Sequence, residues 1–156
     1  NGTGRSRDGE PDARLRRDGL MIIFGIGIDV IEVERIEEAV EGFGDRFLAR
    51  IFTDGEREYC ARQKRPAIHY AARWAAKEAV SKAFGTGIGE QLGWQDMEIC
   101  RRASGEPEVV LHGRGETFAE ENGIEQVKIS LTHAKSYAAA NAVVIGSAVA
   151  RDLDAD

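Results

Sequence analysis

The longest helical signal in the chain is an alanine-rich stretch from Ala67 to Phe84, and it limits what the other residues can fold into. Pro66 fits the first turn of a helix, and Gly85 is a natural residue to end it. Alanine has the highest intrinsic helix propensity, and its small side chain lets another element pack closely. The sequence therefore predicts one long, closely packed helix, whose alanines include positions 71, 72, 75, 76, 79 and 83.

Other segments alternate apolar and polar side chains with the period of a β-strand. In the first, 22–28, the alternation places Ile22, Phe24, Ile26 and Ile28 on one face and Ile23, Gly25, Gly27 and Asp29 on the other. Further strands are predicted at 97–99, 109–111, 127–131 and 137–145, and shorter helices after Asp29, at 43–51 and at 116–121. This pattern predicts an α+β fold, with a mainly antiparallel sheet packed on one long helix and shorter helices.

Length and composition favour a single domain over residues 21–147. The 156 residues are 42% hydrophobic, which is enough for one core. Residues 1–20 mix both charge signs with glycine and proline, which indicates a disordered tail or an upstream extension. Met21 opens the first apolar segment and is a candidate native start. Residues 148–156 follow the last predicted strand and are expected to form a C-terminal tail.

Charge and cysteine content exclude several classes of function. The net charge of −6 and the pI near 5.2 argue against a general nucleic-acid binder, which needs a surplus of lysine and arginine. Cys60 and Cys100 are far apart and show neither disulfide-framework nor zinc-site spacing. The chain has no apolar run long enough to span a bilayer and no secretory signal core. We therefore expect a cytoplasmic protein without a nucleic-acid or membrane partner.

Two carboxylates, Asp29 and Glu78, are candidate metal ligands, and each also has a simpler interpretation. Asp29 ends a glycine-lined strand face, where a hard cation has room, but it also fits a helix N-cap with Glu32 in a capping box. Glu78 precedes Lys82 by four residues, which is the spacing of a solvated ion pair on one helix face. The neighbouring alanines instead favour a half-buried glutamate, which needs a partner or a metal.

A glycine-rich segment, Gly85–Gly89, directly follows the long helix. Walker-type and dinucleotide-binding loops follow a strand and open a helix, so this order argues against both. Exposed N–H groups at Thr86 and Gly87, beside Lys82, can still bind a phosphate as a backbone nest. His133 ends a predicted strand, and no pair of histidines has metal-ligand spacing, so any metal here is expected to have oxygen ligands.

Three segments match the signature of one enzyme family. The first is 25–30 (GIGIDV), followed by Glu34, Arg35 and Ile36. The second is 72–79 (ARWAAKEA) with 82–87 (KAFGTG), and the third is 130–133 (SLTH). Together these segments resemble the motifs of holo-acyl-carrier-protein synthases, the short class of 4′-phosphopantetheinyl transferases, and the likeness runs from Met21 to about Gly146.

The resemblance implies a magnesium-dependent enzyme that moves the 4′-phosphopantetheine arm of coenzyme A onto a serine of apo acyl carrier protein. Adenosine 3′,5′-bisphosphate is released, and the reaction supports fatty acid biosynthesis. By this resemblance Asp29 and Glu78 bind Mg²⁺ and act in catalysis with Lys82, while the general base stays open between Glu78, a metal-bound water and Asp29. Magnesium is usually held by one or two carboxylates plus substrate phosphates, which agrees. The implied coenzyme A contacts are Lys82, Gly85, Thr86, Gly87, Thr132 and His133.

The resemblance also implies a homotrimer with active sites between subunits, and it leaves open which motifs pair across the interface. Carrier proteins are acidic, so Arg35, Arg46 and Arg50 are the candidate docking residues, with a plain solvated helix face as the alternative for Arg46 and Arg50. Two other functions stay possible from the residues alone. One is a non-catalytic coenzyme A or nucleotide-binding oligomeric module, and the other is a structural oligomerisation domain.

Overall fold

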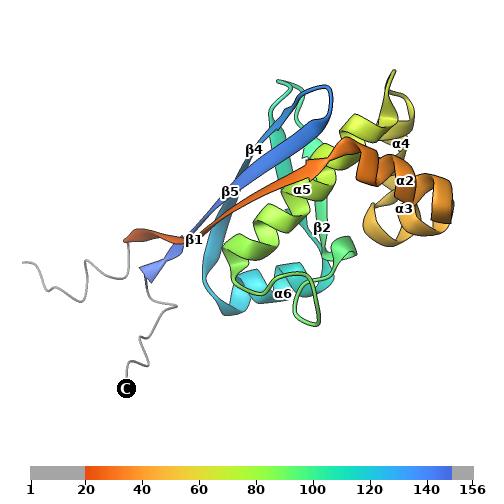
Figure 1. Cartoon of the computed structure of the whole chain (residues 1–156). Helices are drawn as coiled ribbons and strands as arrows, with labels where there is room; N and C mark the ends of the chain where they lie inside the picture. Colours follow the sequence, from red (N-terminus) through yellow and green to blue (C-terminus); the bar gives the residue numbers. More distant parts are fainter. Residues whose placement is uncertain (1–19, 149–156) are drawn as a thin grey trace, which may run out of the picture.

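The computed structural model describes residues 20–148 and lays one long helix, α5 (Pro66–Phe84), along one face of a three-stranded sheet (Figure 1). The sheet has the order β1-β5-β4, with β1 (Met21–Glu32), β5 (Tyr137–Ser147) and β4 (Ile124–His133) antiparallel to their neighbours. Strands β2 (Met97–Arg101) and β3 (Pro107–Leu111) form a separate antiparallel hairpin. The predicted α+β fold is confirmed.

The shorter helices gather at the two ends of α5. Figure 1 shows α2, α3 and α4 at one end and α6 at the other. Their bounds are α2 (Val33–Phe43), α3 (Asp45–Ile51), α4 (Asp54–Ala61) and α6 (Gly113–Glu121), and a short 3₁₀ turn, η1 (Trp94–Asp96), precedes β2. The sequence analysis missed α4, although Thr53 and Glu56 form a capping box at its start, which is a recognisable sequence signal.

The predicted tails lie outside the described residues, apart from their inner ends. Ala148 donates a backbone hydrogen bond to the carbonyl of Leu20 at 3.0 Å, so the two ends of the described chain meet beside β1 and β5. Within residues 20–148, no helix has the length and apolar character needed to cross a membrane.

Strand β1 crosses α5 so closely that two of its positions admit only glycine. A Cβ atom built on Gly25 would overlap the backbone carbonyl of Ala83, and one on Gly27 would overlap that of Ala79. The absence of side chains at these positions lets the strand backbone rest on the helix backbone. The buried alanines of α5 have the matching small size on the other side of the contact. Close packing of β1 on α5 therefore follows from paired small residues.

The predicted faces of β1 are wrong at one point, because the strand contains a bulge. The register with β5 shifts between Ile23 and Gly25. Phe24 turns inward and packs edge-on against Phe118, with the two ring centroids 6.3 Å apart. A one-residue shift exchanges the two faces of a strand. Ile26 and Ile28, which were predicted to share a face with Phe24, therefore point to the solvent. The exposed face of β1 consists of residues with side chains 63–71% exposed: Ile23, Ile26, Ile28 and Val30.

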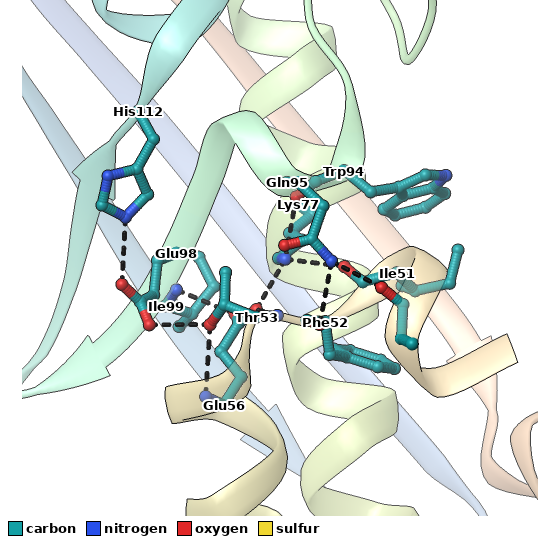
Figure 2. Close-up of polar contacts among 11 residues, drawn as sticks. Ile51, Phe52, Thr53, Glu56, Lys77, Trp94, Gln95, Glu98, Ile99 and His112 are labelled. Carbon is teal, nitrogen blue, oxygen red and sulfur yellow. Dashed lines mark hydrogen bonds and ion pairs between the residues drawn. The ribbon is translucent and has the colours of Figure 1, made fainter. Parts of the chain in front are cut away.

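A fully buried ion pair joins α5 to α4. Lys77 and Glu56 have side chains that are 0% exposed, and the Lys77 ammonium lies 2.6 Å from Glu56 Oε1 (Figure 2). Burial lowers the pKa of Lys77, and the Glu56 carboxylate opposes that shift. Backbone groups complete the hydrogen bonding of both side chains. The Lys77 ammonium donates to the carbonyls of Ile51 and Trp94 at 2.8 and 2.9 Å. The Glu56 carboxylate accepts from the N–H groups of Thr53 and Ile99 at 2.8 and 2.9 Å. The pair thus connects α3, α4, η1 and β2 to α5.

We expect the Lys77→Met substitution to lower the free energy of unfolding by about 3–5 kcal/mol, because it leaves the Glu56 carboxylate buried without its partner. Urea denaturation followed by circular dichroism measures this change. The double variant Lys77→Met, Glu56→Gln should recover part of the loss, since the amide needs no counter-charge. Lys128→Met, at an exposed position on β4, is the control. A Lys77→Met variant as stable as this control would show that the pair contributes no stability.

Candidate active site

Asp29 and Glu78 line one cavity of about 410 Å³ where β1, α2, α3 and α5 meet. Asp29 lies on the inner face of β1, two residues after Gly27, so the close packing of that glycine on α5 brings the carboxylate to the helix. Glu78 is half-buried on α5 and faces the same space. The structure therefore brings together the two carboxylates that the sequence singled out.

Lys82 pairs with Asp29 and not with Glu78. Its ammonium lies 3.1 Å from Asp29 Oδ1 and donates to the carbonyl of Ile28 at 3.0 Å. The alternative in which Glu78 and Lys82 form a helix-surface pair is wrong, since the described residues show no such pair. The N-cap alternative for Asp29 is wrong too, because α2 begins at Val33 and its N-cap position is Glu32.

The two carboxylates lie in a setting that favours a cation. The pKa of Glu78 is raised, first by burial and then by the nearby Asp29 carboxylate, while Lys82 partly offsets this effect. Lys82 is already engaged with Asp29, and Arg35 also lines the cavity, so the Glu78 carboxylate is the one that no ion pair of the described residues engages. Residues 20–148 contain no cluster of three or more His, Cys, Asp or Glu side chains that could hold a metal. Two carboxylates fit Mg²⁺, which commonly takes its other ligands from water and phosphate.

The wall of the cavity is aromatic, and the sequence analysis did not identify it. Trp74 and Phe47 line the space beside Glu78, and their rings stack with centroids 6.0 Å apart. Trp94 packs on Trp74 from outside, with a centroid distance of 4.4 Å. A sequence signal did exist, since Trp74 stands four residues before Glu78 and therefore shares its helix face.

The three candidate docking arginines lie at the mouth of this cavity and beside it. Arg35, from α2, lines the same cavity as Asp29. Arg46 and Arg50 are exposed on α3 and line a second hollow of about 510 Å³ together with Phe43 and Phe47. Phe47 lines both spaces, so the arginine-lined hollow adjoins the carboxylate cavity.

The glycine segment after α5 lacks the free N–H group that was expected at Gly87, because the N–H groups of Gly85 and Gly87 bond the carbonyls of Lys82 and Ser81 at 3.0 and 3.1 Å. Gly85 ends the helix with φ 80° and Gly87 has φ 63°, a conformation that disfavours other residues. A side chain at either position would meet no atom within 4 Å, so the loop borders open space. Thr86 lies between them and bonds the Gly87 carbonyl through its hydroxyl at 2.7 Å. The loop begins three residues after Lys82, which places it at the Lys82 end of α5.

Thr132 and His133 lie at the opposite end of α5. The His133 ring packs against His69, with centroids 5.7 Å apart. His69 precedes Lys82 by 13 residues on the same helix, which corresponds to about 20 Å along its axis. Thr132 and His133 lie level with Val30 and Ile31 in the sheet, two strands away through Ala139 and Ala138, but neither lines the cavity of Asp29 and Glu78.

The sequence and the fold both match one family. The sequence model of the 4′-phosphopantetheinyl transferase superfamily matches residues 25–142. A protein of Chlamydia trachomatis serovar D named holo-[acyl-carrier-protein] synthase is 47% identical over 121 residues, covering 78% of this chain and 98% of the relative.

Solved structures agree. The holo-[acyl-carrier-protein] synthase of Neisseria meningitidis superimposes with a TM-score of 0.75 at 33% identity, covering 79% of this chain and 98% of the other. The Helicobacter pylori enzyme, solved in complex with coenzyme A, gives a TM-score of 0.68 at 32% identity, covering 76% and 98%. On this agreement of sequence, fold and motif positions, the chain belongs to the 4′-phosphopantetheinyl transferase superfamily.

Proposed function

We propose that this protein is a holo-acyl-carrier-protein synthase, which transfers the 4′-phosphopantetheine arm of coenzyme A to a serine hydroxyl of apo acyl carrier protein. The observation that carries this proposal is the meeting of Asp29 and Glu78 in one cavity, with Lys82 bonded to Asp29. A module that only binds coenzyme A has no need of two carboxylates at one point. Acyl carrier protein is the acceptor named for the relatives. We place the reaction in the cytoplasm and propose that it supports fatty acid biosynthesis.

The residues of the cavity divide the work of the reaction. Asp29 and Glu78 would hold Mg²⁺, which when bound would supply positive charge to offset that of the pyrophosphate. Lys82 is half exposed at the edge of the cavity, where its ammonium can move from Asp29 to a phosphate oxygen and stabilise developing charge. The loop of Gly85, Thr86 and Gly87 lies beside Lys82 and borders the phosphates in this scheme. Its Gly85 and Gly87 N–H groups already bond the carbonyls of Lys82 and Ser81, so the Thr86 N–H is the one proposed to bind a phosphate. Trp74 and Phe47 exclude water from one side of the cavity.

The serine proton is accepted by Glu78, by a metal-bound water or by Asp29. Burial and the Asp29 carboxylate raise the pKa of Glu78, whereas binding Mg²⁺ would lower the basicity of either carboxylate. In the balanced step the serine oxygen bonds to the β-phosphorus of coenzyme A, adenosine 3′,5′-bisphosphate leaves with the electron pair of the broken P–O bond, and the serine proton passes to the base.

The test is transfer itself. Incubated with apo carrier, coenzyme A and magnesium, the protein should add one phosphopantetheine to the carrier, as mass spectrometry of the carrier would show. Asp29→Ala and Glu78→Gln should each lower kcat/KM by about 10³-fold, since each removes a metal ligand worth roughly 4 kcal/mol to the transition state.

Two controls accompany these variants. Circular dichroism should show a native fold for both, since neither carboxylate supports the core. Lys128→Ala, an exposed change on β4 outside the three signature segments, should keep wild-type activity. Wild-type rates in Asp29→Ala or Glu78→Gln would falsify the metal assignment for that residue.

A homotrimer would complete the site. Thr132 and His133 do not line the cavity of Asp29 and Glu78 within one chain, so in this proposal a neighbouring copy supplies them to the coenzyme A bound there. The outer face of β1 carries the apolar surface that such an assembly needs, in the exposed row Ile26, Ile28 and Val30. In the paired strand β5, Val143, Asn141 and Ala139 stand opposite these residues and extend the face.

We expect light scattering to give a trimer for the wild type and a smaller species for Ile26→Asp, because a buried carboxylate on this face opposes assembly. Thr117→Asp, on the exposed side of α6, should stay trimeric.

Shared sites have a second signature. Glu78→Gln and His133→Ala, each impaired alone, should regain activity when the two chains are co-expressed and form mixed trimers. A fully active monomer, or a mixture as impaired as its components, would contradict sites shared between subunits.

Arg35, Arg46 and Arg50 form the proposed docking surface for the acidic carrier. Arg46→Glu with Arg50→Glu should raise the Michaelis constant for carrier and leave that for coenzyme A unchanged, because exposed charges steer the acidic partner. The reaction should also lose salt sensitivity. Salt weakens attraction between exposed charges, because the Debye length shortens from about 10 Å at 0.1 M salt to about 3 Å at 1 M, and the double variant no longer has these attracting charges. Steady-state kinetics across a salt series measures both effects.

The matched control reverses two other exposed cations, Arg62 and Lys64, which lie between α4 and α5. It changes the net charge by the same amount at a different place. If both double reversals alter the carrier constant equally, the effect is one of overall charge, and Arg46 and Arg50 are only a solvated helix face.

A further inference from the structure

Two of the three histidines of the chain are in contact, although they come from different elements. His69 lies near the start of α5, and His133 ends β4. Their ring centroids are 5.7 Å apart and the ring planes are inclined by 61°, so the rings meet edge to face. Such a contact depends on the angle between the rings, because the positive edge of one ring is attracted to the negative face of the other. The contact therefore restrains how the His133 ring is turned.

His69 is itself held from the interior of the protein. Its ring packs against that of Tyr59, from α4, with the centroids 6.0 Å apart and the planes at 72°. The guanidinium of Arg73, a residue that is only 3% exposed, lies over the Tyr59 ring at 4.2 Å from its centroid. A series of contacts thus leads from the buried Arg73 through Tyr59 and His69 to the exposed His133. His69 is the member that joins the fixed residues to His133.

The surroundings of this histidine pair are positively charged. Burial lowers the pKa of His69, and the positive charges of Arg73, His133 and Arg101 lower it further. In the described part of the chain the buried Nε atom of Arg73 has no hydrogen-bond partner. Two protonated imidazoles in contact would repel each other, so any proton on the pair is held by His133. The exposed side of the pair thus fits an anionic group such as a phosphate.

We propose that His69 is a positioning residue for coenzyme A binding, because its ring holds the His133 imidazole in the orientation in which a ring N–H reaches a phosphate of coenzyme A. In the proposed function, on which this inference rests, His133 serves the coenzyme A bound by a neighbouring copy. His69 contacts no phosphate in this scheme and acts only through the ring of His133.

Three replacements separate the ring of His69 from its charge state. Alanine removes the contact, so the exposed His133 side chain must be ordered again each time a ligand binds. Phenylalanine has a ring with the same distribution of charge between edge and face, so it can restore the packing. Lysine places a permanent positive charge beside His133 and disfavours the protonated form of that ring.

The experiment compares His69→Ala, His69→Phe and His69→Lys with His112→Ala. His112 is the third histidine and pairs with Glu98 at 3.0 Å just before α6, so it is a matched change away from His133. Steady-state kinetics gives kcat and the Michaelis constants for coenzyme A and carrier. Nuclear magnetic resonance of the imidazole groups follows the titration of His133 in each variant, and circular dichroism gives the melting temperature.

The other charged groups around the pair are the same in all of these variants. Arg73 and Arg101 act on His69, and Tyr59 is the titratable group that packs on it. Arg65 donates to the carbonyl of Lys135, two residues after His133, at 2.9 Å. Any change in the titration of His133 therefore reports the replacement at position 69.

For His69→Ala we expect the KM for coenzyme A to rise about tenfold, while kcat and the carrier KM stay within about twofold of wild type. His69→Phe should restore the wild-type constant, because the ring contact returns. His69→Lys should bind coenzyme A as poorly as His69→Ala at pH 7 and should shift the titration of His133 to lower pH, because the new cation opposes protonation. His112→Ala should match wild type in every measurement.

Three results would overturn the proposal. The first is a wild-type KM for coenzyme A in His69→Ala. The second is a His69→Phe variant as impaired as His69→Ala, with a lower melting temperature in both, which is the signature of a merely structural role. The third is a wild-type KM for coenzyme A in His133→Ala, because His69 would then orient a residue that binds nothing. Failure of the proposed function would look different, since the wild type itself would then leave the carrier unmodified.

Discussion

The backbone contact between β1 and α5 is the constraint on which the rest of the structure depends. Gly25 and Gly27 face Ala83 and Ala79 at a separation that no β-carbon fits, so the strand and the helix approach as closely as their backbones allow. Asp29 follows directly along β1, and this is why its carboxylate reaches Lys82. A wider spacing, as larger side chains would impose, would separate the carboxylate on the strand from the one on the helix. The small residues thus position the site without belonging to it.

Helix α5 uses consecutive residues for opposite purposes. Lys77 points into the protein, where it is fully buried and bonds Glu56, while Glu78 points into the open cavity. Successive residues on a helix are about 100° apart, so this division needs no break in the helix. The Lys77 side also holds the end of α3 through the carbonyl of Ile51. One helix therefore fixes both the proposed metal site and the helix that carries the proposed docking arginines.

Local patterns in the sequence predicted most of the fold, and the misses involve contacts between distant residues. Helix α5 and strands β4 and β5 were predicted correctly, because the apolar residues of each element follow one regular spacing. The faces of β1 were mispredicted beyond Phe24, because the bulge adds a residue that a strict two-residue period cannot represent. The pairing of Lys82 with Asp29, 53 residues away, is invisible to a rule based on helix spacing. The carboxylates themselves were found through motifs, and their place in a common cavity needed the structure.

The buried ion pair also has a consequence for the order of folding. Lys77 and Glu56 come from separate helices, and each is costly to remove from water until the other is in place. Helix α5 can pack on the sheet through its alanine side while Lys77 still has its hydration shell. Docking of α3, α4 and η1 must then occur in one step, because the ammonium needs Glu56, Ile51 O and Trp94 O together to replace the water it loses. We therefore expect this end of the molecule to open and close as a single cooperative unit.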